Sequence, residues 1–317
     1  MSKPVPIQLG LCCINTTLKK HKPPVYAGRR IIVRIINEKG IQELKRRILC
    51  NLSDLLTMIE WNEMNGIRVF RLSSELFPHK NNPKTPDYDY DFALDHLSKI
   101  GNLAKKYNHR LTFHPGQFNV LSSLNTNAYQ QTLKDLDHHA TLFDLMGLDH
   151  NSVMVIHGGG VYGDKEKTLL RWCDNYHKLS DKIKNRLVLE NCEKSYSIVD
   201  CLRIYKLTGI PIVFDTHHFE CYKLLHPHEK FHDPEVYIPM ILKTWKNKNI
   251  KPKFHVSEQG SGRIGHHSDF IDILPQYLLD IPKKYGIHID IMIEAKMKEL
   301  SIQKLYEKYP QCNCILS

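Results

Sequence analysis

Eight short β-rich segments, each bounded by turn residues, constrain the fold of this 317-residue chain more than any other feature. In order they are PIQLGLCC from Pro6, RVFRLSS from Arg68, RLTFHP from Arg110, SVMVIHGG from Ser152, RLVLEN from Arg186, PIVFDTHH from Pro211, KPKFHVSE from Lys251 and IDIMIEAK from Ile289. Such apolar runs are typical of parallel strands that are buried on both faces. Between them, apolar residues recur three and four positions apart, which predicts amphipathic helices.

The alternation of strand and helix predicts an α/β fold, a single TIM (β/α)8 barrel, because parallel strands need helical crossovers. An open doubly wound sheet is the alternative, but no G-x-G-x-x-G follows the first segment. We expect one domain over residues 1–317, with a core from about 6 to 300 and a short C-terminal tail. The stretch HKPPVYAGRRIIVRIINEKG, residues 21–40, is expected to form a loop or a hairpin.

The chain is basic, with 44 Lys and Arg against 34 Asp and Glu, a formal net charge of +10. This charge favours a polyanion such as nucleic acid as partner, although a solvated lysine-rich surface explains the same count. Nine cysteines without framework spacing argue against a disulfide scaffold. No leader-like N-terminus or long apolar run occurs, so we expect a soluble intracellular protein, cytoplasmic or nuclear, without membrane contact. No protein partner is implied.

Polar and ionisable residues stand at the C-terminal ends of six predicted strands. They are His114 and Gln117, His157, Glu190 and Asn191, Asp215 with His217 and His218, His255 and Glu258, and Glu294 and Lys296. In a closed barrel these ends meet on one face, which carries the catalytic groups of this fold. We therefore expect residues that are distant in the sequence to form one pocket.

Several carboxylates and imidazoles in one pocket predict a metal centre, because burying them together is costly without a compensating cation. Three or more His with two or three Asp and Glu exceed the ligands of one tetrahedral ion, so we expect two or three ions. Imidazole and carboxylate donors without thiolate favour Mn²⁺ or Zn²⁺ over Ca²⁺. Such clusters activate water for displacement at phosphorus, and a basic protein makes a phosphodiester the leading substrate.

Eight motifs in order resemble the UV damage endonuclease family. They are RLSSELFP (71–78), FHPGQF (113–118), IHGGGVYGDK (156–165), LENCE (189–193), FDTHH (214–218), KFHVSEQ (253–259), GHHSDF (265–270) and IEAKMKE (293–299). The resemblance implies a TIM barrel with a divalent metal cluster, of Mn²⁺ in most members and with Zn²⁺ or Mg²⁺ as alternatives. It also implies damaged double-stranded DNA as the partner.

Carried over motif by motif, the resemblance implies one set of metal ligands. The set is His114, His157, Glu190, Asp215, His218, His255, His267 and Glu294. Glu75 of RLSSELFP is a further ligand or a neighbour of the cluster. Lys253, two residues before His255 on the same strand face, stabilises the phosphate or, if modified to an acidic form, bridges metals; an ordinary barrel lysine with a carboxylate partner is the alternative. Glu190 is predicted as the most sensitive catalytic residue.

Further residues are expected to contact DNA. In the family the pair at Gln117 and Phe118 enters the duplex at the lesion, where weakened stacking makes extrusion cheaper; a tight turn with Phe118 packed is the alternative. Leu11 stands where the family usually has a tyrosine, which leaves lesion preference open, and Asn15 matches the pattern. Lys165 is a candidate contact to the DNA backbone, as is Lys230, and a solvated surface role is the alternative for both.

The segment PIVFDTHH poses a local conflict. Strand alternation puts Asp215 and His217 on one face and therefore favours His217 as the ligand, whereas the resemblance implies His218. Strand alternation and the assignment of His218 are compatible only if the strand ends at Asp215 or Thr216 and the chain turns there.

The resemblance implies an endonuclease that nicks duplex DNA 5′ of UV photoproducts, and also at abasic sites, leaving 3′-hydroxyl and 5′-phosphate ends. An abasic-site nuclease of the endonuclease IV type is the main alternative. A metal-dependent sugar isomerase fits the fold and the ligands but not the net charge of +10. A lesion-binding protein without catalysis does not need so many convergent ligands.

Overall fold

The computed structural model describes residues 5–315 and contains eight strands at the eight predicted segments. The strands are β1 (Ile7–Cys12), β2 (Val69–Arg71), β3 (Arg110–Thr112), β4 (Met154–His157), β5 (Leu187–Glu190), β6 (Ile212–Asp215), β7 (Lys253–Val256) and β8 (Ile289–Ile293). All neighbouring strands pair in parallel, in the order β3-β2-β1-β8-β7-β6-β5-β4. This order is that of a barrel opened between its third and fourth strands.

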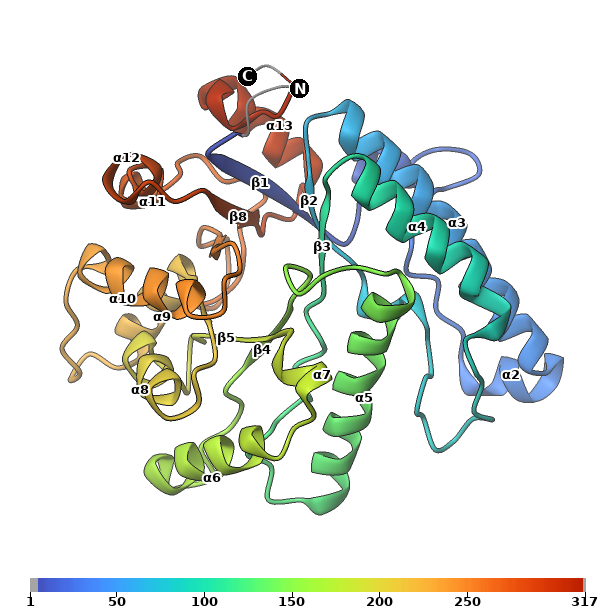
Figure 1. Ribbon diagram of the computed structural model, residues 1–317, viewed down its shortest axis with the longest axis horizontal. Coiled ribbons are helices and arrows are strands. Elements are labelled where there is room, and N and C mark those ends of the chain that lie inside the picture. The colour runs from blue at the N-terminus through green and yellow to red at the C-terminus, as the bar shows by residue number, and fades with distance from the viewer. Residues whose placement is uncertain (1–4, 316–317) are drawn as a thin grey trace.

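Phe113 closes the gap between β3 and β4. Its N–H donates to the carbonyl of Val153 and its carbonyl accepts from the N–H of Val155, both at 3.0 Å. A parallel bridge between Phe113 and Met154 results. The predicted (β/α)8 barrel is therefore confirmed, and Figure 1 shows the longer helices arranged around the strands.

The helices fill the connections between the strands. They are α1 (Thr16–Lys19), α2 (Val33–Lys39), α3 (Ile41–Met64), α4 (Leu94–Lys106), α5 (Thr126–Leu145), α6 (Lys165–His177), α7 (Asp181–Lys184), α8 (Ile198–Thr208), α9 (Thr216–Leu225), α10 (Pro234–Lys246), α11 (Gln276–Leu279), α12 (Ile281–Tyr285) and α13 (Glu299–Lys308). Short 3-10 turns are η1 (Ser74–Leu76), η2 (Asp91–Ala93) and η3 (Pro310–Cys312). Across residues 5–315, none of the helices combines the length and apolar character that a membrane span requires.

The prediction of a loop or hairpin for residues 21–40 was wrong in its second half. Residues Val33–Lys39 form α2, which ends at Gly40 with a φ of 78°. The β-branched run before it favoured a strand locally, but Ile36 is buried in the main apolar cluster when the segment is helical. Tertiary packing therefore overrode the local propensity.

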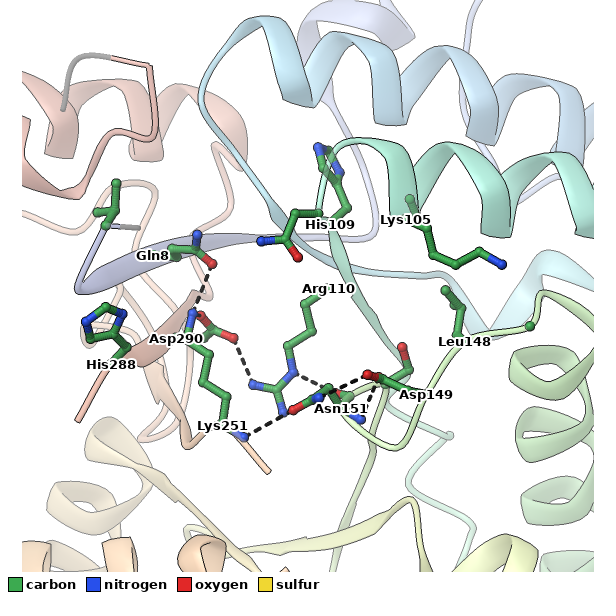
Figure 2. A pocket seen from close by; sticks show the side chains of 15 residues that line it. Gln8, Lys105, His109, Arg110, Leu148, Asp149, Asn151, Lys251, His288 and Asp290 are labelled. Carbon is green, nitrogen blue, oxygen red and sulfur yellow. Dashed lines mark hydrogen bonds and ion pairs between the residues drawn. The ribbon is translucent and has the colours of Figure 1, made fainter. Parts of the chain in front are cut away.

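Buried ion pairs lie at the N-terminal end of the barrel, opposite the strand ends that carry the predicted ligands. Arg110 Nη1 on β3 lies 2.8 Å from the fully buried carboxylate of Asp290 on β8, and Lys251 pairs with the same carboxylate. Burial would raise the pKa of Asp290, but Lys251 and Arg110 outweigh it and lower the pKa. Figure 2 shows these side chains at a cavity of about 490 Å³. In this fold that end serves stability.

We expect Asp290→Ala to lower the free energy of unfolding by about 3–5 kcal/mol, because Arg110 then keeps an uncompensated buried charge. Urea denaturation measures the change. The matched control is Asp95→Ala, which removes an exposed carboxylate paired with Lys99 at 2.7 Å, and it should cost less than about 1 kcal/mol. Equal losses in the two variants would contradict the structural role of Asp290.

Candidate metal centre

The buried carboxylate of Glu190, at the end of β5, lies at the centre of the predicted ligands. Its Oε2 is 3.0 Å from His114 Nε2 and 3.6 Å from His157 Nε2. Its Oε1 is 2.8 Å from His255 Nδ1 and 3.6 Å from His218 Nδ1. Burial would raise the pKa of Glu190, but His255, His157 and His114 outweigh it and hold the pKa well below the ordinary value. Glu190 is therefore an ionised carboxylate with an imidazole pair at each oxygen.

Glu294, at the end of β8, forms the second carboxylate of the cluster. Its Oε1 lies 3.2 Å from His255 Nδ1, and its Oε2 lies 3.9 Å from His267 Nδ1. Arg71 on β2 donates to the same carboxylate. Burial opposes ionisation of Glu294, but Arg71 and His255 outweigh it and lower the pKa. His255 thus links Glu294 to Glu190.

The end of β6 positions Asp215 and His218 through a helix cap. The strand ends at Asp215 and α9 begins at Thr216, so the chain turns where the assignment of His218 requires it. Asp215 Oδ1 accepts a hydrogen bond from the N–H of His218 at 2.7 Å, which caps the helix. The turn carries His218 Nδ1 to 3.7 Å from Asp215 Oδ2, on the side of Glu190.

His217 lies away from Glu190, although strand alternation had favoured it. Its ring is buried against Cys221, with Nε2 3.5 Å from the sulfur, and lies edge-on to the His267 ring at 5.9 Å. The geometry thus brings His218, and not His217, to the central carboxylate.

Two triads of donor atoms are close enough to hold a divalent cation. They are His114, His157 and Glu190, and Glu190, Asp215 and His218, with the donor atoms of each triad within 4.8 Å of one another. Asp215 Oδ2 and His255 Nε2 are buried without a hydrogen-bond partner among the described residues, which is rare for buried polar atoms. Oxygen and imidazole donors without thiolate suit Mn²⁺ or Zn²⁺. These residues therefore fit a metal centre in which Glu190 is shared.

Without a cation the site binds extra protons. Burial, followed by the neighbouring carboxylates of Glu190 and Glu294, raises the pKa of Asp215 to about 8, against the opposing effect of His218. Burial disfavours the imidazolium of His218, but Asp215 and Glu190 outweigh it and raise the pKa to about 9. At neutral pH bound protons therefore compensate part of the negative charge among these donor atoms.

Lys253 and Glu75 both lie outside the two donor triads. Lys253 is fully buried, donates to Thr112 Oγ1 at 3.0 Å and has no carboxylate within ion-pair distance in residues 5–315, so the paired-lysine alternative does not fit. Burial, then Arg110 and Arg71, lower its pKa to about 7. Glu75 pairs with the exposed Arg30 at 3.1 Å, outside both donor triads.

Gln117 and Phe118 project from the loop between β3 and α5. Gln117 is exposed and Phe118 keeps 67% of its surface, so the alternative of a packed phenylalanine does not describe this conformation. Asn119 anchors the loop by donating to Gly116 O at 3.0 Å and to Asp135 Oδ2 at 2.7 Å. The Phe118 ring folds so closely over Gly116 that a side chain at 116 would clash with it. A turn anchored by Asn119 therefore presents an exposed aromatic ring.

The other predicted DNA contacts differ in accessibility. Leu11 and Asn15 are fully buried, and Asn15 caps α1 by accepting from the N–H of Leu18, so neither offers a surface to a duplex in this conformation. Lys165 is held in an ion pair with Asp200 at 2.6 Å, whereas Lys230 is exposed. Direct contact by Leu11 or Asn15 would require the first barrel segments to move.

Sequence reasoning missed Arg71, the partner of Glu294. Its side chain is only 14% exposed, and its Nε has no partner among the described residues. The signal was present, because Arg71 ends the second strand just as the predicted ligands end theirs. A buried cation beside a carboxylate cluster keeps that cluster ionised and offers a free donor to a bound phosphate.

We predict that His218→Ala lowers the bound metal content of the purified protein and that His217→Ala does not, because only His218 reaches Glu190. Elemental analysis after Mn²⁺ loading and desalting measures this. The two variants remove the same side chain from adjacent positions of α9, so each controls for the other. A larger metal loss in His217→Ala would overturn the assignment.

We also predict that metal binding releases protons, because the metal-free site keeps them on His218 and Asp215. Calorimetric titration with Mn²⁺ in buffers of different ionisation enthalpy should show roughly one proton or more released per ion at about pH 7. Both folded pKa values are raised, so the release should fall, and the affinity rise, as the pH increases toward about 9. A release that does not change with pH would contradict this protonation.

The chain is similar to several known proteins over most of its length. The family model described as UV-endonuclease UvdE matches residues 7–316. A protein of Acanthamoeba polyphaga mimivirus is 41% identical over 308 residues, which cover 96% of this chain and 91% of that protein. The UV-damage endonuclease of Schizosaccharomyces pombe is 35% identical over 325 residues; these cover 98% of this chain but only 52% of the yeast protein, so the chain spans about half of that relative.

The crystal structure of SacUVDE superposes with a TM-score of 0.80 at 28% identity and covers 96% of this chain and 99% of its own. The likeness thus extends over the whole barrel and its loops. Because the family model spans nearly the full length, this chain belongs to the UV-endonuclease UvdE family.

Proposed function

We propose that this protein is a divalent-metal-dependent DNA repair endonuclease that nicks duplex DNA immediately 5′ of UV photoproducts. The products carry 3′-hydroxyl and 5′-phosphate ends. The observation that carries the proposal is the shared Glu190, which lies within two donor triads at one mouth of a barrel whose rim presents Phe118. Membership of the UV-endonuclease family supports the substrate class.

The site residues have different roles in the proposed reaction. Divalent ions bound here would supply an activated water at neutral pH and would neutralise charge on the phosphate. His114, His157 and Asp215 would supply ligand atoms to these ions, and ionised Glu190, which belongs to both triads, would orient the attacking water. The remaining ligands of the proposed set are His218, His255, His267 and Glu294.

Two buried cations lie beside the cluster and favour an anionic substrate. Arg71 contacts Glu294 directly and has a free Nε, so it can orient a phosphate oxygen. Lys253 has a pKa lowered to about 7, so near neutral pH it is partly protonated and adds a positive charge below the site. We assign Lys253 an electrostatic role toward the phosphate.

Lesion recognition follows from the anchored turn that carries Gln117 and Phe118. A photoproduct weakens stacking and pairing, so kinking and unstacking the duplex there costs less than at normal bases. An inserted aromatic ring and an amide then occupy the space that the damaged bases leave. An abasic site lowers the same cost, and we therefore include abasic sites among the substrates.

We expect Mn²⁺-loaded protein to nick an ultraviolet-irradiated duplex and an abasic duplex, and to leave undamaged DNA intact. Chelation should abolish cutting, and Glu190→Gln should reduce it at least about 10³-fold, because the uncharged amide would bind divalent ions more weakly in both donor triads. Gel mapping of the nick and end labelling measure the position and the end groups. Glu166→Gln, which neutralises an exposed carboxylate paired with Arg203, is the matched control and should keep most of the activity.

If only the abasic duplex is cut, the protein is an abasic-site nuclease and the proposed activity on photoproducts is wrong. Turnover of free aldoses without any nicking would favour the isomerase. Tight binding to irradiated DNA without any incision in Mn²⁺ would indicate a lesion-binding protein without catalysis. This result would overturn the nuclease proposal.

A further inference from the structure

A groove lies between α10 and α12, which are neighbours in the outer ring of helices (Figure 1). Its cavity has a volume of about 440 Å³, and its apolar lining consists of Pro239 and Leu242 of α10, Tyr285 at the end of α12, and Ile287. Tyr285 and Ile287 come shortly before β8 begins, so the groove lies toward the N-terminal end of the barrel. It is therefore on the side of the barrel away from the metal centre.

Large apolar side chains beside this groove are exposed. Val236 and Met240 keep 50% and 42% of their surface, and Tyr285 keeps 41%. Val236 and Met240 each precede a lining residue of α10 by three positions, which places them on the groove side of the helix. Apolar surface that is contiguous in this way, and not scattered as single residues, is typical of an interaction site.

Two lysines at the groove have no counter-ion. Lys243 and Lys246 belong to its lining and are exposed, and neither has a carboxylate within ion-pair distance in residues 5–315. The nearby Lys284, by contrast, pairs with Asp280 at 3.3 Å and with Glu235 at 3.9 Å. These two carboxylates are thus already engaged, and the groove keeps an excess of positive charge.

Stabilisation of the helix explains only part of this arrangement. Lys243 and Lys246 lie in the last turn of α10, where a positive charge interacts favourably with the helix dipole. Lys105 and Lys106 have the same position in α4. The dipole accounts for the two charges on α10 but not for the exposed apolar side chains beside them. A ligand that is both apolar and acidic accounts for both features.

We propose that the groove between α10 and α12 is a docking site for an acidic segment of another protein. A large apolar side chain of that segment enters the groove, and carboxylates on either side of it pair with Lys243 and Lys246. Burial of apolar surface stabilises the complex, and the complementary charges orient the segment and speed its association. A partner docked here leaves the metal centre open to DNA, so both ligands bind at the same time.

Two other occupants fit the groove less well. The phosphates of a nucleic acid would pair with the lysines but would leave the apolar walls in contact with water. A second copy of this chain would bring two pairs of unpaired lysines together, and like charges repel. An acidic segment with an apolar side chain is the occupant that satisfies the walls and the edge together.

The first test uses fluorescein-labelled peptides that carry two glutamates on each side of one central residue. The central residue is phenylalanine, leucine, tryptophan or serine, and fluorescence anisotropy measures binding to the purified protein. We expect at least one apolar peptide to bind about tenfold more tightly than the serine peptide, which corresponds to about 1.4 kcal/mol. If no peptide binds, or if the serine peptide binds as tightly as the other three, the groove is not a docking site.

Reversal of charge shows where the peptides bind. Lys243→Glu combined with Lys246→Glu should weaken binding of the apolar peptide by at least about tenfold, because attraction at the groove is replaced by repulsion. The matched control is Lys105→Glu combined with Lys106→Glu, which changes the net charge equally in the last turn of α4 and should leave the affinity unchanged. Equal weakening in the two double variants would show a response to net charge alone and would overturn the proposal.

Tyr285→Ser tests the apolar wall without changing the charge. Tyr285 is 41% exposed, so the fold should tolerate the substitution, and binding of the apolar peptide should weaken several-fold. An unchanged affinity would overturn the proposal, as would displacement of the peptide by an excess of undamaged duplex, which would assign the lysines to nucleic acid. Sedimentation of the protein alone is measured in parallel. A dimer that Tyr285→Ser dissociates would assign the groove to a second copy and would also overturn the proposal.

Discussion

The burial of the Glu190 carboxylate among imidazoles is the interaction on which the site depends. A carboxylate withdrawn from water is costly unless hydrogen-bond donors or cations surround it. The four imidazoles that contact Glu190 come from the segment just after β3 and from β4, α9 and β7, so no pair of neighbouring strands could assemble them. The ring of contacts exists only because the barrel closes at Phe113. Closure of the barrel therefore brings together the imidazoles that compensate the buried charge of Glu190.

The charge of buried carboxylates is compensated in different ways at the two ends of the barrel. At the N-terminal end Asp290 has permanent partners in Arg110 and Lys251, so that end is electrostatically complete. At the C-terminal end Asp215 Oδ2 has no hydrogen-bond partner in the described residues, and protons compensate the excess charge. Only the second arrangement leaves a place for an exchangeable cation. This contrast explains why metal chemistry is expected at one mouth although both mouths bury acids.

The rim adds recognition to this centre. The turn at Gly116 holds Phe118 exposed, and Asn119 fixes that turn onto Asp135 of α5. The same aspartate lines a cavity at the barrel rim together with Phe118, so the exposed ring and this cavity share one support. Pre-organised groups lose less conformational entropy on binding than flexible ones do. Because this turn is tied to α5, the DNA must deform to bind it. Lesions are then distinguished from normal sites by the cost of deforming the duplex.

Much of the molecule followed from sequence patterns. The strand positions, the barrel and the gathering of strand-end polar residues at one mouth could be predicted because strand burial and the convergence of C-terminal ends are local or topological properties. Arg71 was visible as a strand-end residue, although its pairing with Glu294 was not. The buried states of Leu11 and Asn15, and the helix α2, could not be predicted, because they depend on packing between distant segments.

The pair His217 and His218 separates what the sequence alone determines from what only the tertiary structure decides. The sequence by itself determined that two adjacent imidazoles follow an acid at the end of an apolar strand. Only the tertiary structure decided between them, because the choice depends on the capping of α9 by Asp215 and on Glu190 arriving from the neighbouring strand. Which atoms approach a buried carboxylate is a property of the closed barrel, since its partners come from segments that meet only after folding.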